Sequence, residues 1–295
     1  MALVATLIAN PSNPLLTEEV AATAAATVSA KDRRWLAEGV ALDLELDSDA
    51  GAPQVREALQ NALGDLAVDV VVQPGDARRK RFLLADMDST MIGQECIDEL
   101  ADEIGVRDRV SAITARAMNG EIAFEPALRE RVGLLKGLPV SVVARVLQTR
   151  ITLAPGGREL VQTMRANGAY TALVSGGFTL FSGPIAERIG FDEHRANRLI
   201  VADDVLTGEV AEPILGRQAK IDTLDDIVAR HGLSHEDAIV VGDGANDLGM
   251  IERAGTGVAL HAKPSVAEAA PVRIDHGDLT ALLYLQGYSR ADFAE

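Results

Sequence analysis

Two pairs of aspartates in this sequence have the residue type and the spacing that metal-dependent chemistry requires. Asp86 and Asp88 are separated by one residue in "FLLADMDSTMIGQE" (82 to 95), and Asp243 and Asp247 lie in "GDGANDLGM". Carboxylates that converge in an apolar site repel one another and become protonated unless a cation is bound. Oxygen ligands without clustered histidine or cysteine favour Mg2+ over zinc. A magnesium ion held by carboxylates is typical of phosphoryl chemistry, because the ion neutralises phosphate oxygens.

A hydroxyl, two glycines and a lysine could complete a phosphate site. Ser175 begins "SGG", and Lys220 lies near the start of a predicted amphipathic helix, "GRQAKIDTLDDIVARHG", whose N-terminus favours a phosphate. From its spacing alone, Lys220 is more often expected to be an exposed, solvated lysine than a phosphate ligand. A solvated Lys220 therefore remains the alternative. Two other motifs are excluded. "GDGAND" has Asp247 where GxGxxG requires glycine, and "LVSGG" has Leu173 where GxSxG requires glycine.

These residues end short apolar segments that predict the strands of a parallel sheet. The segments are "RFLLAD" (81 to 86), "YTALVS" (170 to 175), "DAIVVGD" (237 to 243), "GVAL" (257 to 260) and "PVRID" (271 to 275). Helical segments lie between most of them, so both faces of the sheet should be covered. In such folds ligands bind at the carboxyl ends of the strands, where Asp86, Ser175 and Asp243 lie.

Residues 87 to 169 separate the first two predicted strands and have helical periodicity. Ile97, Leu100 and Ile104 recur at i, i+3 and i+7, which indicates an amphipathic helix. A helical insertion directly after the first strand predicts a cap over the carboxyl end of that strand, at about residues 93–153.

The first part of the chain predicts a separate small α+β domain at residues 1–77, with residues 78–295 forming the main domain. Its predicted elements are a strand at 3–9, a helix at about 16–30, a strand at 40–47, a helix at 52–64 and a strand at 68–74. The order β-α-β-α-β, with one strand split as an alternative, predicts a small sheet with helices on one face. The linker "PGDARRKR" (74 to 81) carries four consecutive basic residues, which are interpreted as solvated rather than as a nucleic-acid patch.

The charge balance of the whole chain argues against nucleic acid and membranes as partners. The 295 residues include 28 Lys and Arg against 44 Asp and Glu, a formal net charge of −16, which repels phosphate backbones and anionic lipids. Cys96 is the single cysteine, which excludes an internal disulfide and suits a reducing cytosol. "MALVATLIANP" lacks a basic n-region, and no apolar run reaches about 18 residues. We therefore expect a cytoplasmic protein without a leader or a membrane span.

Four motifs in a fixed order carry a family resemblance. "DMDST", "VSGG", Lys220 and "GDGANDLGM" resemble the motifs of the haloacid dehalogenase superfamily of phosphatases. "DMDSTMIGQECIDELA", "FEPALRERVGLLKGLP", "LVSGGF" and "ANRLIV" are similar to its phosphoserine phosphatase family, and the resemblance covers about residues 82 to 285. It implies a Rossmann-like parallel sheet core with a helical cap insertion. The element order of residues 1–77 is similar to the ACT-like domains of some relatives.

The resemblance assigns a role to each motif residue. It implies that Asp86 is the nucleophile that forms an aspartyl-phosphate, and that Asp88 acts as general acid and then as general base. It implies that Mg2+ is held by Asp86, Asp243 and the backbone carbonyl of Asp88, with Asp247 supporting the site. The residues that it assigns to phosphate and substrate binding are Ser175, Gly176, Lys220 and Asn246.

Within the insertion, the resemblance assigns specificity to two charged residues. Glu95 is similar to the group that receives the substrate ammonium. Arg131 is similar to the group that pairs with the substrate carboxylate, a planar anion that guanidinium binds through two donors. Phe124 and Met118 could supply an apolar lid that excludes water.

The reaction that the resemblance implies is Mg2+-dependent hydrolysis of O-phospho-L-serine to L-serine and phosphate, the last step of serine biosynthesis. Two alternatives stay open: a phosphotransferase that passes the Asp86 phosphoryl group to another amino alcohol, and an amino-acid sensor built on a phosphatase scaffold. Asp86 and Asp88 are both present, which disfavours the sensor. The expected partner is the small molecule O-phosphoserine, with a homodimer possible and neither nucleic acid nor membrane involved.

Overall fold

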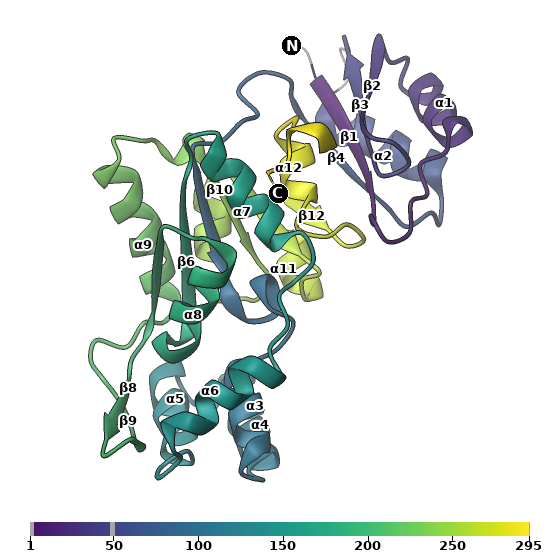
Figure 1. Ribbon diagram of the computed structural model, residues 1–295. Helices are drawn as coiled ribbons and strands as arrows, with labels where there is room; N and C mark the ends of the chain where they lie inside the picture. Colours follow the sequence, from purple (N-terminus) through teal and green to yellow (C-terminus); the bar gives the residue numbers. More distant parts are fainter. Residues whose placement is uncertain (1–2, 48–50, 295) are drawn as a thin grey trace.

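The main sheet of the protein has six parallel strands. A computed structural model describes residues 3–47 and 51–294 and orders this sheet β12-β11-β10-β5-β6-β7 (Figure 1). All five strand pairs within it are parallel. The strands are β5 (Phe82–Asp86), β6 (Tyr170–Phe178), β7 (Glu193–Asn197), β10 (Ala238–Gly242), β11 (Thr256–Leu260) and β12 (Val272–Ile274). The predicted parallel-sheet core is confirmed.

Both faces of the six-stranded sheet are covered by helices, and the alternation of residues along β5 separates them. Leu83 and Ala85 belong to one buried cluster, which includes α7 (Gly157–Ala166), α8 (Thr179–Ile189) and α12 (Ala281–Leu285). Phe82 and Leu84 point to the other face and join the cluster of α9 (Arg217–Arg230), α10 (Leu248–Arg253) and α11 (Pro264–Ala269). Burial on both faces explains why the strand is apolar throughout.

Five of the six strands match the predicted apolar segments, but β7 was not predicted. Its sequence, "EHRAN", is polar, and it is an edge strand that pairs with β6 alone. The strand therefore depends on its backbone pairing with β6 and not on a hydrophobic pattern. A second missed element follows, the hairpin of β8 (Leu199–Ala202) and β9 (Val205–Val210).

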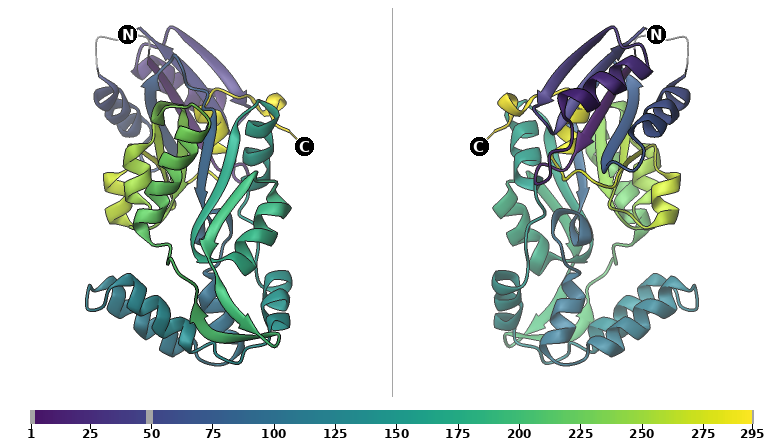
Figure 2. Two further views of the ribbon diagram at one scale, coloured as in Figure 1. Left: turned by 90° about the vertical axis from the view of Figure 1, so that its left-hand side faces the viewer. Right: turned by 90° about the vertical axis from the view of Figure 1, so that its right-hand side faces the viewer.

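A helical cap lies beyond the carboxyl end of β5, as predicted. Its helices are α3 (Cys96–Glu103), α4 (Arg107–Met118), α5 (Phe124–Gly133) and α6 (Val140–Thr149). Figure 2 shows this group at the end of the sheet, with the β8–β9 hairpin running beside it. The two cap connections pair at Ile92 and Leu153. The hairpin holds the cap as well, because Gly137 N donates to Leu206 O at 2.8 Å and Leu206 N donates to Leu138 O at 2.8 Å.

The N-terminal domain is a four-stranded antiparallel sheet in the order β2-β3-β1-β4, with two helices on one face. Its elements are β1 (Leu3–Ala9), α1 (Glu18–Thr27), β2 (Asp32–Ala37), β3 (Ala41–Leu46), α2 (Ala52–Leu63) and β4 (Val68–Pro74). The strand predicted at 40–47 corresponds to β3, and β2, which was not predicted, precedes it and pairs with it as a hairpin. The result is the split β-α-β arrangement expected of an ACT-like domain.

The prediction of a fully solvated linker between the two sheets is wrong for Arg78. Its side chain is 9% exposed and binds Asp43 through two hydrogen bonds, of 2.7 and 3.1 Å. Arg78 Nε also donates to Leu285 O at 2.9 Å, so the linker residue ties β3 to the end of α12. Asp43 is buried, although it alternates with apolar residues in "ALDLEL", a pattern that is typical of a half-exposed strand.

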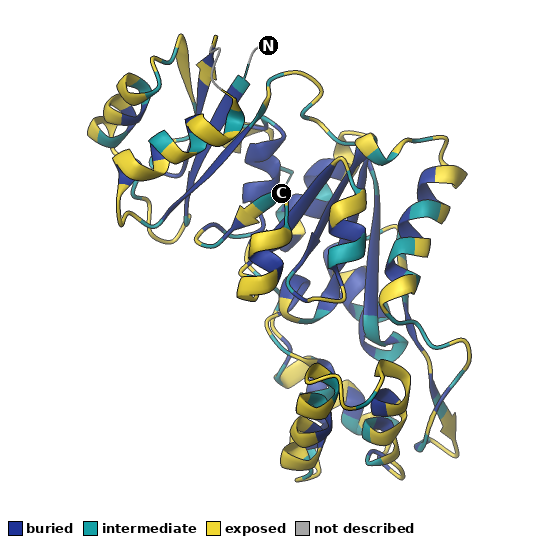
Figure 3. Ribbon diagram, turned by 180° about the vertical axis from the view of Figure 1, so that it is seen from behind, coloured by how far each residue is buried: buried dark blue, intermediate teal, exposed yellow. Residues whose placement is uncertain are grey.

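The second face of the N-terminal sheet packs on the main domain. Ile8, Leu36 and Val71 join the buried cluster that contains α12, and Figure 3 shows the central strands of both sheets as mostly buried. Among the described residues, none of the helices combines the length and the apolar character needed to cross a membrane.

Candidate active site

Asp86 is the last residue of β5, and Asp88 lies in the tight turn that follows it. Asp86 is 5% exposed. Both Asp86 and Asp88 have extended backbone angles, and the chain then reverses at Ser89, where φ is 55°. Asp88 Oδ1 accepts a hydrogen bond from Cys96 N at 2.9 Å, and its Oδ2 accepts one from Ser175 Oγ at 3.1 Å. The first residue of the cap helix α3 and the end of β6 thus orient Asp88.

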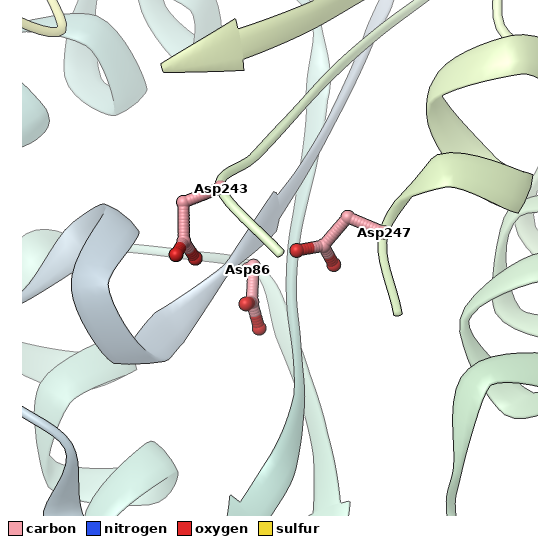
Figure 4. Close-up of side chains that lie close together, drawn as sticks. All are labelled: Asp86, Asp243 and Asp247. Carbon is pink, nitrogen blue, oxygen red and sulfur yellow. The ribbon is translucent and has the colours of Figure 1, made fainter. Parts of the chain in front are cut away.

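Three of the four predicted carboxylates form a cluster. One oxygen each from Asp86, Asp243 and Asp247 lies within 4.8 Å of the others, and Figure 4 shows the three side chains converging from separate segments. Burial, reinforced by Asp247, raises the pKa of Asp86 well above its usual range and that of Asp243 to about 6. A divalent cation would relieve this repulsion, and the all-oxygen donor set fits a hard cation.

Lys220 lies under this cluster, and the solvated alternative is wrong. The side chain is 2% exposed, and Nζ lies 2.6 Å from Asp86 Oδ1 and 2.6 Å from Asp247 Oδ1. Burial opposes the charged form of Lys220, but the two carboxylates outweigh it and raise the lysine pKa above its ordinary value. The first turn of α9 therefore places a permanent positive charge beside the predicted nucleophile.

Two glycines permit this close packing at the end of β10. A Cβ on Gly242 would lie 2.4 Å from Asp247 Cγ, and one on Gly244 would lie 2.4 Å from Asn246 Oδ1. Asp247 Oδ2 also accepts a hydrogen bond from Gly244 N at 3.0 Å. The glycines of "GDGAND" thus serve side-chain packing, because any larger residue would displace Asp247 or Asn246.

A cavity of about 420 Å3 opens above the carboxylates, between the sheet and the cap. Asp247 and Lys220 lie beneath its floor and do not line it. The predicted site residues that line it are Asp86, Asp88, Glu95, Met118, Phe124, Arg131, Ser175, Gly176, Asp243 and Asn246. Residues separated by up to 160 positions thus share one cavity, as the motif order predicted.

The cap side of the cavity carries two acids, Glu95 and Asp98, and one base, Arg131. Ser89 Oγ donates to Glu95 Oε1 at 2.7 Å, and burial together with Asp88 raises the pKa of Glu95. Arg131 is held by Thr114, whose Oγ1 accepts from Nη1 at 3.3 Å. Within residues 3–47 and 51–294 no carboxylate forms an ion pair with Arg131. Its guanidinium is thus available to an anion that enters the cavity.

A family model for haloacid dehalogenase-like hydrolases matches residues 83–252, more than half of the chain. The chain belongs to this family. A curated relative, the phosphoserine phosphatase of Archaeoglobus fulgidus, is 43% identical over 233 residues, which cover 78% of this chain and 67% of the relative. The hydrolase motifs at Asp86, Ser175, Lys220 and Asp243 all lie inside the matched residues.

Solved structures of similar proteins agree with this membership of the hydrolase family. A hydrolase of the same family from Salmonella enterica superposes with a TM-score of 0.86 at 32% identity, covering 96% of this chain and 98% of that one. A phosphoserine phosphatase with a phospho-aspartyl intermediate analogue superposes with a TM-score of 0.65 at 42% identity, covering 70% of this chain and 98% of that one. The second match thus covers nearly all of the other chain but leaves almost a third of this one unmatched.

The two predicted lid residues of this hydrolase line the cavity but remain partly open to solvent. Phe124 is 40% exposed and Met118 is 65% exposed. The Phe124 ring lies over two glycines, since a Cβ on Gly216 would lie 3.2 Å from Phe124 Cδ1 and one on Gly176 would lie 3.6 Å from Cζ. The lid role stays a prediction.

Three polar residues that line the cavity were not predicted from the sequence: Asp98, Thr114 and Lys263. Lys263 lies just past the carboxyl end of β11, and this position was a signal that could have identified it. Asp98 and Thr114 lie on cap helices, where no motif separates them from ordinary surface residues.

Proposed function

We propose that the protein is a Mg2+-dependent phosphatase that hydrolyses O-phospho-L-serine to L-serine and phosphate through an aspartyl-phosphate on Asp86. One observation carries the proposal: a single cavity has Asp86, Asp88 and Ser175 on its sheet side and Glu95 and Arg131 on its cap side. A phosphate, an ammonium group and a carboxylate each find a partner there. The names of the relatives with over 40% identity support the same substrate.

In the first step, an Asp86 carboxylate oxygen attacks phosphorus, an O–P bond forms and the bond to the seryl oxygen breaks. Asp88 gives its proton to that departing oxygen, so free serine leaves as an alcohol. Burial raises the pKa of Asp88, which favours the protonated form that this step needs. Lys220 offsets the negative charge of Asp86 and lies where it can stabilise the transferred phosphoryl group.

In the second step, Asp88 takes a proton from water, and the water oxygen attacks phosphorus as the bond to Asp86 breaks. Phosphate is released, and Asp88 is protonated again for the next substrate. The hydrogen bonds from Cys96 N and Ser175 Oγ keep the Asp88 carboxylate aimed at the cavity in both steps. Closure of Phe124 and Met118 over the cavity would limit access of other water molecules.

Mg2+ is the proposed cofactor, held by Asp86, Asp243 and the backbone carbonyl of Asp88, with Asp247 supporting the site. The ion supplies charge neutralisation of the phosphate oxygens. Support comes from the three clustered carboxylates and from the raised pKa of Asp243, which marks an uncompensated charge.

Specificity for phosphoserine rests on the cap in this proposal. Glu95 would bind the substrate ammonium, and Arg131 would bind the carboxylate. Arg131 forms no ion pair among the described residues, and its partial burial lowers its pKa although Asp98 and Glu95 partly offset this effect, so binding of a further anion would be favourable. Ser175, Gly176 and Asn246 are the proposed phosphate contacts.

We also propose the division of the chain into residues 1–77 and 78–295, with the cap at about 93–153. The N-terminal domain would be an accessory unit, because a similar phosphatase is covered to 98% by a match to 70% of this chain. Asp43 and Arg78 help to fix the relative position of the two domains, together with the hydrogen bonds that Asp69 accepts from the backbone of Asp275, His276 and Gly277.

The test is phosphate release from L-phosphoserine, phosphothreonine and p-nitrophenyl phosphate, with Mg2+ or EDTA, and with Asp86→Asn protein as the control. Strong preference for phosphoserine that depends on Mg2+ and on Asp86 supports the proposal. Equally slow turnover of all three substrates would support the phosphatase chemistry but contradict the specificity for phosphoserine. Phosphate release only in the presence of an amino alcohol acceptor would instead indicate a phosphotransferase.

A further inference from the structure

Asn197, the last residue of β7, has no part in the proposed chemistry, yet its side chain joins two segments of the site. It is fully buried. Asn197 Nδ2 donates to Gly176 O at 2.8 Å and to Leu215 O at 3.0 Å, and Oδ1 accepts from Leu215 N at 2.7 Å. Both amide protons and the amide oxygen are therefore used, and they bridge the end of β6 and the segment before α9.

The first bridge leads to Asp88. The pairing of β6 with β7 shifts register between Val174 and Phe178, so the regular ladder is interrupted where Ser175 lies. Asn197 holds the carbonyl of the peptide between Gly176 and Gly177 instead. The N–H of this same peptide donates to Ser175 Oγ at 2.8 Å, and Ser175 Oγ donates to Asp88 Oδ2 at 3.1 Å. The side-chain amide of Asn197 thus orients the peptide that orients Ser175.

The second bridge leads to Lys220. Leu215, bonded through both its N–H and its carbonyl, immediately precedes Gly216, the N-cap of α9. Lys220 lies in the first turn of that helix and contacts Asp86 and Asp247. Because a helix is stiff over one turn, the position of its first residue sets the position of Lys220.

We propose that Asn197 is a positioning residue that aligns the Ser175–Gly176 part of the phosphate site with the Lys220 part. The two parts belong to different elements, and the Asn197 amide binds both. Phe124, on the cap, lies over Gly176 and Gly216, the residues on either side of this junction. A displacement of either glycine would therefore also change how the cap packs on the main domain. The inference rests on the proposed function, because it assumes that these groups bind a phosphoryl group.

A buried asparagine is usually hydrogen-bonded, so the experiment must separate positioning from ordinary stabilisation. Gln286 is the matched control, because it too is buried and bridges two segments. Its Nε2 donates to Leu282 O at 2.9 Å, and its Oε1 accepts from Lys80 N at 2.9 Å. Neither segment touches the cavity.

The test compares Asn197→Asp with Gln286→Glu, two near-isosteric changes that each remove the amide donors. Thermal stability, kcat and KM are measured on L-phosphoserine and on p-nitrophenyl phosphate, and binding of inorganic phosphate is measured by calorimetry. We expect both variants to lose stability. Asn197→Asp alone should lower kcat about 10- to 100-fold by the same factor on both substrates, and weaken phosphate binding about tenfold. Asn197→Ser, which is uncharged and keeps one donor, should show an intermediate loss of kcat and phosphate affinity. It keeps the test valid if the Asn197→Asp protein does not fold.

The proposal is overturned if both Asn197 variants keep kcat and phosphate affinity within about threefold of the unchanged protein, or if Gln286→Glu loses as much as they do. Failure of the substrate assignment gives a different result. The unchanged protein would then hydrolyse p-nitrophenyl phosphate and not phosphoserine, while the Asn197 effect would still be measured on the former. If neither substrate is turned over, the phosphate affinities of the Asn197 variants and of Gln286→Glu test the positioning role.

Discussion

Lys220 Nζ lies 2.6 Å from Asp86 Oδ1, and both side chains are buried. The lysine is the permanent positive charge that lets Asp86, Asp243 and Asp247 share one site. Removing one member of a buried ion pair leaves an uncompensated charge, which costs far more than losing a surface contact. The ammonium group of Lys220 therefore has a structural and a chemical consequence.

Lys220→Met should lower kcat at least about 100-fold and make thermal stability depend on Mg2+. Without the ammonium group the metal must neutralise more of the charge on the three carboxylates, so Mg2+ should raise Tm more in this variant than in the unchanged protein. Differential scanning calorimetry with Mg2+ and with EDTA measures the effect. Lys31→Met, which removes an exposed lysine paired with Asp47, is the control. Equal Mg2+-induced shifts in all three proteins would contradict the proposed compensation.

Asp86→Asn and Asp88→Asn should differ in a rapid-mixing experiment with p-nitrophenyl phosphate. p-Nitrophenolate leaves without protonation, so Asp88→Asn protein should still form the aspartyl-phosphate once and then stall, because it lacks a base for hydrolysis. We expect a burst of about one p-nitrophenolate per active site. Asp86→Asn protein should give no burst, because it has no nucleophile. A burst from the Asp86 variant would remove Asp86 from this role.

The sequence predicted the strand ends of the site well, for a physical reason. Apolar runs such as "FLLAD" are buried on both faces of the sheet. A charged residue at the end of such a run is therefore expected at the carboxyl end of the strand, where the sheet stops. The charge state and burial of Lys220 could not be predicted in this way. Its partners lie 134 and 27 residues away, and only the folded chain brings them within 2.6 Å.

The interface between the domains was less predictable. Asp43 alternates with apolar residues along its strand, a pattern that normally places the acid in water, and Arg78 lies in a basic run that normally forms a solvated linker. Each is the other's main charged partner, and Thr6 and the carbonyls at the end of α12 supply the remaining hydrogen bonds. Likewise, "EHRAN" has no strand signal, so the position of Asn197 was not predictable either.

Arg131→Ala should reduce kcat/KM for phosphoserine about 10- to 150-fold, which corresponds to losing about 1.5–3 kcal/mol of charge-assisted hydrogen bonding. The same change should have little effect on p-nitrophenyl phosphate, which has no carboxylate. Steady-state kinetics on both substrates measure the difference. Arg116→Ala is the matched control, because Arg116 lies on the cap in an exposed pair with Glu130 and does not line the cavity. Equal losses on the two substrates would exclude Arg131 from recognition of the carboxylate.

Mg2+ binding should weaken as the pH falls below about 6, the pKa to which burial and Asp247 raise the Asp243 carboxyl group. Below that pH Asp243 is protonated in the metal-free protein, and the proton must leave before the metal binds. Above it the carboxylate is already ionised. Affinity should therefore fall at least about tenfold per pH unit below pH 6, and its slope should lessen above pH 6, where Asp86, whose pKa is also raised, is the remaining ligand that can lose a proton. Calorimetric titration with Mg2+ at several pH values measures this. Asp243→Asn should bind Mg2+ weakly with a flatter pH dependence; an unaltered pH dependence would assign the proton to another group.

Arg78→Met should lower the free energy of unfolding by about 3–5 kcal/mol, because it leaves Asp43 buried without its main partner. The loss should fall on the N-terminal domain first. Trp35, the single tryptophan, lies in β2, so its fluorescence reports on that domain, while enzyme activity reports on the main domain. In urea the two probes should change together in the unchanged protein and separate in the variant, with fluorescence changing at the lower concentration.

Arg79→Met is the control for that experiment. The Arg79 guanidinium lies 4.2 Å from the centre of the Tyr288 ring, a cation–π contact that contributes only about 0.5–1 kcal/mol when exposed. It follows Arg78 in the linker and has the same charge, so any general effect of removing a basic linker residue should appear in both variants. A loss of stability in Arg79→Met as large as in Arg78→Met, with the two probes still coincident, would show that the buried pair does not join the domains.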